Sequence, residues 1–298
     1  MISTETGHPI HPLHCGVHRL VLGRRTLVMG VLNLTPDSFS DGNQFSTISN
    51  ALAHAEGMMA DGADIIDIGG ESTRPGAQYI SEEEELVRIR PLLKVLGRQA
   101  RVPLSIDTRK AAVAKVALDL GACIVNDVSA LQDDPEMVRV VRDAGAAVIL
   151  MHRQGHSATM QQNPRYGQVI WDVLEFLRER ARFAEEAGIA PDRIVVDPGI
   201  GFGKTQADNL KLLAHIPQFF ALGYPVLIGA SRKAFLGELT GKSVQDREMG
   251  HAAVVATAVW QGAHVVRGHD VKAMHDVVMV AQALRRAHEA GAEDLNHS

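Results

Sequence analysis

Apolar and polar positions follow a repeated order along this chain: a short apolar run, a cluster of polar residues and glycines, and then a stretch with helical spacing. The first clear case is residues 27–43, which read LVMGVLNLTPDSFSDGN. The near-continuous apolar run predicts a strand buried on both faces, as in parallel sheets. The turn-forming residues after it interrupt regular structure for about ten residues. Candidate chemistry therefore begins where this strand ends.

Seven further segments repeat this order along the chain. They begin at Ile65 (IIDIGGESTRPGA), Leu104 (LSIDTRK), Cys123 (CIVNDVS), Ala147 (AVILMH), Ile194 (IVVDPGIGFGKT), Pro225 (PVLIGASRK) and His264 (HVVRGHD). Strand and helix pairs with polar residues at every strand's carboxyl end predict an α/β fold, the parallel (β/α)8 TIM barrel, whose active site lies at that end. A doubly wound open sheet is the alternative, and it also binds its ligand beyond the strand ends.

One barrel of roughly 250 residues accounts for nearly the whole chain, so we predict a single catalytic domain over residues 17–290. Residues 17–29 read VHRLVLGRRTLVM, two short apolar runs around Gly23, Arg24 and Arg25. This pattern predicts an N-terminal β-hairpin that closes the barrel bottom. Residues 1–16 are predicted to form a flexible tail, although their histidines also allow weak metal binding.

Composition narrows the classes of function. Hydrophobic residues make up 46% of the 298 positions, enough for a large core. Lys and Arg total 30 against 35 for Asp and Glu, a net charge of −5, and aromatic residues make up only 4%. Nucleic-acid binding would favour a basic surface with stacking aromatics, so we expect no nucleic-acid partner.

Cysteine use and hydropathy indicate the compartment. Cys15 and Cys123 are the two cysteines, and Cys123 lies in a predicted buried strand, so both are expected to be free thiols in a reducing environment. No stretch approaches the ~20 apolar residues of a membrane-spanning helix, and the amino terminus lacks a signal pattern. We therefore expect a cytoplasmic protein with no membrane partner.

A glycine-rich turn follows the strand that begins at Ile194. Gly199, Gly201, Gly203, Lys204 and Thr205 superficially suggest a nucleotide-binding loop, but neither the Walker pattern nor the dinucleotide pattern fits their spacing. They predict a tight turn that lets backbone approach a ligand. A purely structural turn is the alternative.

Asp107, Asn126 and Asp197 each end a different predicted strand, so the barrel would point all three into one cup. Two carboxylates and an amide suit a neutral heterocycle with several N–H donors, and an aminopyrimidine edge offers two parallel donors to one carboxylate. Helix capping is the structural alternative, mainly for Asp107. Metal ligation by these carboxylates lacks the further ligand expected of a firm site.

A second group of strand-end residues has complementary chemistry. Arginine, histidine, hydroxyl and amide groups that share one rim suit phosphate oxygens, and this group comprises Asn33, Ser72, Thr73, Arg74, Arg267 and His269. Surface salt bridges are the alternative for any single arginine. Ser231, Arg232 and Lys233 follow the seventh strand, where a loop amide or helix start would bind a carboxylate. No nucleophile elbow with a Ser, His and Asp order is present, which argues against hydrolase chemistry.

The motifs MGVLNLTPDSFSDGNQF, DIGGESTRPGA, SIDTRK, NDVSAL, DPGIGFGK, GASRKAFLG and RGHDV together resemble those of dihydropteroate synthases. They occur in that family's order from Leu27 to Val271. The resemblance implies a transferase of folate biosynthesis. It would condense 6-hydroxymethyl-7,8-dihydropterin diphosphate with 4-aminobenzoate, giving 7,8-dihydropteroate and diphosphate.

The same resemblance implies three groups of ligand contacts. The pterin would lie against Asp107, Asn126, Met151, Asp197, Lys233 and Arg267. The diphosphate would be held by Asn33, Thr73, Arg74, Arg267 and His269, with Mg²⁺ as cofactor near Asn33. The 4-aminobenzoate would lie near Phe39, Thr73, Pro75, Phe202 and Ser231. Catalytic roles would fall to Asn33, Arg74, Asp107, Lys233, Arg267 and His269.

The resemblance also implies a dissociative substitution at the pterin methylene, a homodimer and sensitivity to sulfonamides. An arylamine is unprotonated at neutral pH, so no strong general base is required. Two positions depart from the usual family pattern. Gly268 stands where valine is more common, which is expected to loosen that strand end, and Gln78 to Ile80 differ after the second motif. The alternatives are a non-catalytic pterin-binding homologue and a methyltransferase-type pterin-binding domain.

Overall fold

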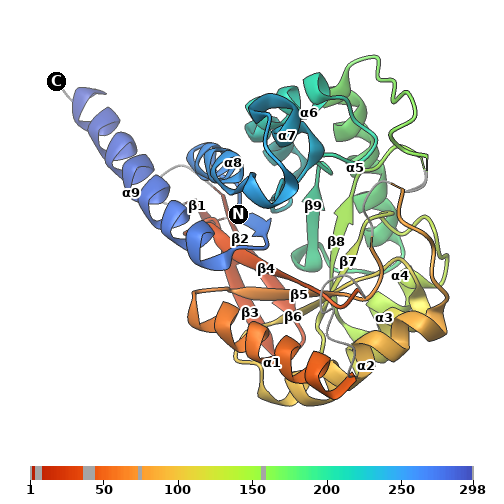
Figure 1. Ribbon diagram of the computed structural model, residues 1–298. Coiled ribbons are helices and arrows are strands. Elements are labelled where there is room, and N and C mark those ends of the chain that lie inside the picture. The colour runs from red at the N-terminus through yellow and green to blue at the C-terminus, as the bar shows by residue number, and fades with distance from the viewer. Residues whose placement is uncertain (1, 4–8, 36–43, 73–75, 156–158, 297–298) are drawn as a thin grey trace.

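The computed structural model describes residues 2–3, 9–35, 44–72, 76–155 and 159–296. Each of the eight predicted apolar runs forms a strand (Figure 1). These strands are β4 (Leu27–Asn33), β5 (Ile65–Gly69), β6 (Leu104–Asp107), β7 (Ile124–Asp127), β8 (Ala147–Met151), β9 (Ile194–Asp197), β10 (Leu227–Gly229) and β11 (Val265–Gly268).

The eight strands form one parallel sheet in the order β10-β11-β4-β5-β6-β7-β8-β9. The two end strands also meet, because Val196 of β9 forms a parallel bridge with Val226, next to β10, and its amide donates to Pro225 O at 2.9 Å. Strands that follow in chain order and close on themselves make a barrel, whereas a doubly wound sheet reverses its order at a switch point. The barrel prediction is confirmed.

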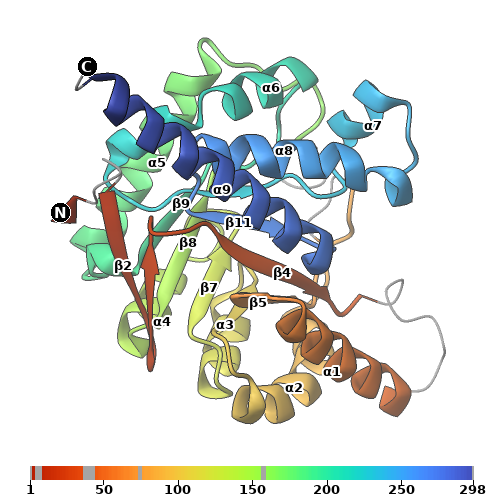
Figure 2. The same cartoon turned by 90° about the vertical axis from the view of Figure 1, so that its left-hand side faces the viewer.

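Helices follow the strands and cover the outside of the barrel (Figures 1 and 2). Buried aliphatic side chains fill the layer between helices and strands. They are α1 (Gln44–Ala60), α2 (Glu82–Gln99), α3 (Ala111–Asp119), α4 (Met137–Ala144), α5 (Val169–Glu186), α6 (Gln206–Ala214), α7 (Ala234–Thr240), α8 (Glu248–Trp260) and α9 (Val271–Asn296).

Local sequence signals set several helix ends. Ser81 caps α2 by accepting a hydrogen bond from the Glu84 amide, and four glutamates follow it where the helix dipole favours negative charge. Thr205 and Asp208 form a reciprocal capping box at the start of α6. Gly145 ends α4 in the left-handed conformation. Short 3-10 helices at Pro191–Arg193 (η2), Ile216–Leu222 (η3) and Val244–Asp246 (η4) complete the connections. No helix in the described ranges is long and apolar enough to cross a membrane.

The N-terminal hairpin differs from the predicted one in its pairing. Strand β2 (Pro9–Cys15) pairs antiparallel with β3 (His18–Leu22), and a two-residue β1 (Ile2–Ser3) adds to β2. The prediction paired residues 17–22 with 26–29 instead and left residues 1–16 as a tail. It was wrong for Pro9–Cys15, because prolines and histidines hid a strand with one apolar face. The turn lies at Gly16, which has φ +56°.

The hairpin closes the amino end of the barrel, as predicted. Leu13, Cys15 and Leu22 are buried against side chains from the lower barrel interior. Those side chains are Leu27, Met29, Ile65, Cys123, Ile124, Ala147, Ile149, Val195, Leu227 and Val265. Figure 2 shows β2 at the edge of the molecule, away from the carboxyl end of β4. The polar residues at the carboxyl ends of the strands are therefore left at the opposite, open end.

This packing predicts the effect of truncating the hairpin's central apolar side chain. Leu13 is 1% exposed in the barrel floor, so Leu13→Ala should lower the free energy of unfolding by about 2 to 5 kcal/mol, measured by urea denaturation. Val17→Ala is the matched control, because Val17 at the turn is 97% exposed and should change stability little. Equal stability of the two variants would mean that the hairpin does not stabilise the barrel.

Candidate active site

Strand register brings the predicted cup residues together at one rim. Asp107 of β6 lies opposite Asn126 of β7, and Met151 of β8 lies opposite Asp197 of β9. Arg267 of β11 lies opposite Gly229 of β10. The strands' carboxyl ends thus supply acceptors, an amide, a thioether and a guanidinium to one opening, as the sequence predicted.

Arg267 forms the centre of a charged network in this cup. Its Nε donates to Asp67 Oδ2 at 2.7 Å, and its Nη2 donates to Asp107 Oδ2 at 2.8 Å. Asn126 Nδ2 donates to the same Asp67 oxygen at 3.0 Å. The guanidinium therefore holds two carboxylates from different strands in fixed orientation, which a single ammonium would not do.

Asp67 is a site residue that sequence analysis missed. It lies within β5 and its side chain is fully buried. A charged residue inside an apolar run is costly unless it is paired, so the isolated Asp in IIDIGG was the available signal.

Two buried carboxylate oxygens in the cup have no hydrogen-bond partner among the described residues. They are Asp67 Oδ1 and Asp107 Oδ1. Burial raises the pKa of Asp107 to about 7; Arg267 opposes this shift and Asp67 adds to it. Buried acceptors of this kind are satisfied when a ligand brings N–H donors.

Asp197 supplies a further acceptor in the same cup. Its Oδ1 accepts a hydrogen bond from the Gly199 amide at 2.7 Å. Burial raises the pKa of Asp197 to about 6, and the Gly199 bond and the charge of Arg267 oppose this shift. Asp197 is therefore largely ionised at neutral pH.

An apolar wall stands beside these acceptors. Met151 and Phe202 pack with Val128 and Met160 in a small buried cluster. Lys233 Nζ lies 3.6 Å from the centre of the Phe202 ring, a cation–π contact. A Cβ on Gly201 would lie 2.8 Å from Lys233 Cδ, so that glycine makes room for the lysine stem. Apolar side chains and buried carboxylates thus lie together at the carboxyl ends of the strands, a combination that suits a flat ligand with N–H donors.

The polar rim joins three further strand ends. Ser231 Oγ lies 2.9 Å from His269 Nδ1, and Asn33 Nδ2 lies 3.5 Å from His269 Nε2. Asn33 ends β4, while Ser231 and His269 follow β10 and β11. The structure thus places these three predicted residues side by side next to Arg267.

Four predicted ligand contacts, Phe39, Thr73, Arg74 and Pro75, lie outside the described residues. The residues on either side of 73–75 are tightly held. Glu71 Oε2 accepts from Lys110 Nζ at 3.0 Å, and Glu71 Oε1 accepts from the Ile80 amide at 3.1 Å. Lys110 also donates to Glu85 at 2.7 Å and lies 4.6 Å from the Tyr79 ring centre. The unusual residues at 78–80 thus pack against the motif that holds Asp107.

Gly268, the other departure, does not leave an empty space. A Cβ at this position would lie 2.6 Å from His251 Cε1 and 3.0 Å from Met274 Sδ. His251 of α8 therefore fills the place of the usual side chain. The expectation of a loosened strand end has no support in this packing.

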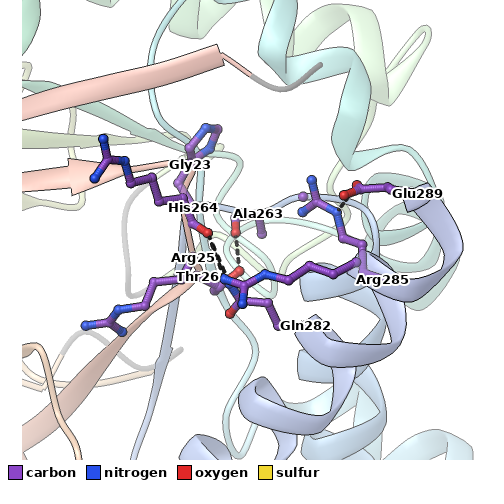
Figure 3. A pocket seen from close by; sticks show the side chains of 11 residues that line it. Gly23, Arg25, Thr26, Ala263, His264, Gln282, Arg285 and Glu289 are labelled. Carbon is purple, nitrogen blue, oxygen red and sulfur yellow. Dashed lines mark hydrogen bonds and ion pairs between the residues drawn. The ribbon is translucent and has the colours of Figure 1, made fainter. Parts of the chain in front are cut away.

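A separate pocket lies at the amino end of the barrel, where β4 and β11 begin (Figure 3). Two of its arginines have carboxylate partners: Arg25 is paired with Asp64, and Arg285 Nε donates to Glu289 at 2.8 Å. Thr26 Oγ1 donates to Ala263 O at 2.7 Å. Gln282 Nε2 and Arg286 Nη2 of α9 donate to Arg24 O at 3.3 and 3.2 Å, which ties α9 to the segment before β4, so we assign this pocket a structural role.

Comparison with known proteins agrees with this geometry. The sequence model of the protein family described as pterin-binding enzymes matches residues 29–269 of this chain. The dihydropteroate synthase from Synechocystis sp. is 44% identical to this chain, and the match covers 92% of this chain and 96% of that protein. The one from Neisseria meningitidis serogroup C is 48% identical, and the match covers 86% of this chain and 92% of that protein. The Xanthomonas albilineans dihydropteroate synthase, solved with 4-aminobenzoic acid, is 44% identical with TM-score 0.87, covering 93% of this chain and 99% of its own.

A Yersinia pestis dihydropteroate synthase, solved with a sulfonamide drug, is 41% identical with TM-score 0.87, covering 92% of this chain and 99% of its own. The fold and the strand-end site thus define a pterin-binding transferase. More narrowly, the chain belongs to the dihydropteroate synthase family.

The contacts of the Arg267 guanidinium with two carboxylates predict that replacing Arg267 lowers stability by an amount that depends on pH. Arg267→Met leaves Asp67 and Asp107 buried without their cation, which should cost about 3 to 5 kcal/mol of unfolding free energy at pH 8. Arg267 opposes the raised pKa of Asp107, so its removal should raise that pKa further. The folded variant then binds protons more readily than the parent as the pH falls, and the cost should shrink towards pH 5. Urea unfolding at both pH values measures it, with the exposed Arg178→Met as control. A loss independent of pH would contradict the charge explanation.

Proposed function

We propose that the strand-end site condenses 6-hydroxymethyl-7,8-dihydropterin diphosphate with 4-aminobenzoate, giving 7,8-dihydropteroate and diphosphate. The observation that carries this proposal is the set of buried acceptors at Asp67, Asp107 and Asp197, two of which have an oxygen without a partner in the described structure. An aminopyrimidine ring presents N–H donors that such acceptors can bind.

The pterin would lie in the cup with its donor edge towards Asp107, Asn126 and Asp197. Met151 and the stem of Lys233 would contact its faces. Arg267 would stack or donate at the open side, since 21% of its side chain remains exposed. The cup then selects its ligand by donor pattern, because a ring with acceptors there would leave buried carboxylates unpaired.

The diphosphate would lie against the rim of Asn33, Arg267 and His269, with Thr73 and Arg74 as further proposed contacts. His269 and the guanidinium of Arg267 would stabilise charge that develops on the leaving group. Serine hydroxyl contact with His269 Nδ1 fixes the imidazole orientation at this rim.

Mg²⁺ is proposed as the cofactor of this rim. Asn33 offers a hard amide oxygen, and the described residues contain no group of three or more His, Cys, Asp or Glu side chains placed to hold a metal. Magnesium is commonly held by one or two protein oxygens together with substrate phosphates and water, and this donor set fits that arrangement. When bound, the ion would neutralise the departing diphosphate.

The 4-aminobenzoate would lie beside Phe202 and Ser231, with Phe39, Thr73 and Pro75 as further proposed contacts. The related enzyme solved with 4-aminobenzoic acid supports this ligand, and the one solved with a sulfonamide supports sulfonamide sensitivity. The chain's residues need only align the neutral amine with the pterin methylene as the diphosphate departs. No general base is therefore assigned.

Homodimer formation is also proposed. Helices α8 and α9 lie side by side (Figure 2) and carry exposed apolar side chains, namely Met249, Trp260, Met279, Val280 and Leu284. Such a patch is typical of a protein interface. Sedimentation at the mass of one chain would contradict it. A cytoplasmic location stays a prediction from the two free cysteines.

Release of diphosphate tests the function directly. The purified protein, given the pterin diphosphate and Mg²⁺, should release diphosphate in step with dihydropteroate formation only when 4-aminobenzoate is present. A protein that binds pterin but forms no dihydropteroate would instead be the non-catalytic homologue.

Asp197→Asn should weaken pterin binding by about 2 to 4 kcal/mol at pH 8, because the amide turns a donor towards a ligand donor. The parent's affinity should fall below pH 7 as Asp107 and Asp197 gain protons. The difference between parent and variant should therefore narrow at pH 5. Calorimetric titration measures both effects, and an unchanged affinity at pH 8 would remove Asp197 from the pterin site.

The proposed pterin diphosphate and 4-aminobenzoate sites lie next to each other, and this predicts an order of binding. A sulfonamide should bind weakly to the protein alone and more tightly once pterin, diphosphate and Mg²⁺ are present, because those ligands complete one side of the aromatic site. The coupling should be about 1 to 3 kcal/mol. Titration of one sulfonamide under the two conditions measures it. Equal affinities would show that the arylamine site is complete without the first substrate.

A further inference from the structure

Lys204 has an unusual environment for a lysine, in the glycine-rich turn after β9. Its side chain is 3% exposed. Its Nζ lies 2.9 Å from His152 Nδ1, 2.9 Å from Gly199 O, 3.1 Å from Phe202 O and 3.3 Å from His152 O. The four acceptors around this buried amine stabilise it, because a buried amine without hydrogen-bond partners would strongly destabilise the fold.

The partners of Lys204 are the two ends of one tight turn. The Phe202 amide donates to Gly199 O at 3.1 Å, and Lys204 donates to the carbonyls of both residues. His152 follows β8, so the amine also ties this turn to the neighbouring strand end. Burial and the nearby Lys204 lower the pKa of His152 well below its usual value, which leaves Nδ1 free to accept.

The turn packs so closely against the loop after β8 that its glycines leave no room for a side chain. Gly199 has φ +69°, and a Cβ there would lie 1.9 Å from His152 O. A Cβ on Gly203 would lie 2.5 Å from Gln154 O. The glycines therefore allow the turn to approach the β8 loop, and Lys204 supplies the donors that hold it there.

Two proposed ligand contacts depend on this turn. The Gly199 amide orients the Asp197 carboxylate at 2.7 Å, and Phe202 presents its ring beneath Lys233. Lys204 reaches neither substrate subsite itself, since its described contacts lie on the backbone and His152. It can act only through the placement of those two residues.

We propose that Lys204 is a positioning residue that sets the places of the Asp197 carboxylate and the Phe202 ring, and thereby governs binding in both halves of the substrate site. The second half of this statement rests on the proposed function. Its first half concerns the protein alone. The two can be tested separately.

Amide hydrogen exchange of the ligand-free protein tests the first half. Lys204→Met keeps length and removes every donor, so the Gly199 and Phe202 amides should exchange at least tenfold faster than in the parent. Lys211→Met, at an exposed position on α6, is the matched control and should leave both rates unchanged. Unchanged exchange in Lys204→Met would overturn the proposal.

Affinity for 7,8-dihydropteroate, which spans both halves, tests the second. Lys204→Met should weaken it at least tenfold, and Lys211→Met should stay within twofold of the parent. Lys204 is also among the cations that oppose the raised pKa of Asp197, so its loss should move the pH midpoint of ligand affinity upward. An affinity within twofold of the parent, with an unmoved midpoint, would overturn the role in binding.

A pair of His152 variants decides the matter if Lys204→Met does not fold. His152→Leu removes the acceptor opposite Nζ, whereas His152→Asn places an amide oxygen close to the position of Nδ1. Faster exchange and weaker binding in the leucine variant, restored by asparagine, would support the proposal. Identical behaviour of the two would overturn it. If the parent bound no dihydropteroate, the proposed function would fail, and exchange alone would still decide how the turn is held.

Discussion

Parallel strands that close into a barrel must bring all their carboxyl ends to one rim, whatever lies between them in sequence. In this chain the bridge between Val196 and Val226 completes that closure. Asp67 and Arg267 are then brought within 2.7 Å although 200 positions separate them. The hairpin at the other end fills the floor with apolar side chains, so the charged groups have a single open end at which to meet.

The guanidinium of Arg267 balances the charge of two carboxylates at this rim. Arg267 contacts two buried carboxylates, and each keeps an oxygen without a partner among the described residues. The ion pairs therefore stabilise the buried charges, while two carboxylate oxygens still lack a hydrogen-bond donor among the described residues. Burial that raises the pKa of Asp107 and Asp197 also makes their oxygens strong selectors of N–H donors, because any ligand that fails to donate leaves them unsatisfied.

The residues that follow β9 are held in place by a closely packed turn. Phe202 and Asp197 are held through a turn whose glycines contact neighbouring backbone and whose carbonyls accept from Lys204. Glu71, Lys110 and Glu85 form a comparable buried network beside the end of β5. Neither network is proposed to contact a ligand directly. Their sequence motifs look like ligand-binding loops, but their side chains support the residues that are proposed to bind the ligands.

The sequence by itself determined the barrel, its eight strands and the main acceptors at Asp107, Asn126 and Asp197, because apolar runs and the polar residues that end them are local signals. The tertiary structure alone decided how β2 pairs, since prolines and histidines hid its apolar face. It also decided the roles of Asp67 and Lys204. Asp67 lies 200 positions from Arg267, and Lys204 lies 52 positions from His152. Only folding brings to each residue the distant partner that helps to make its burial possible.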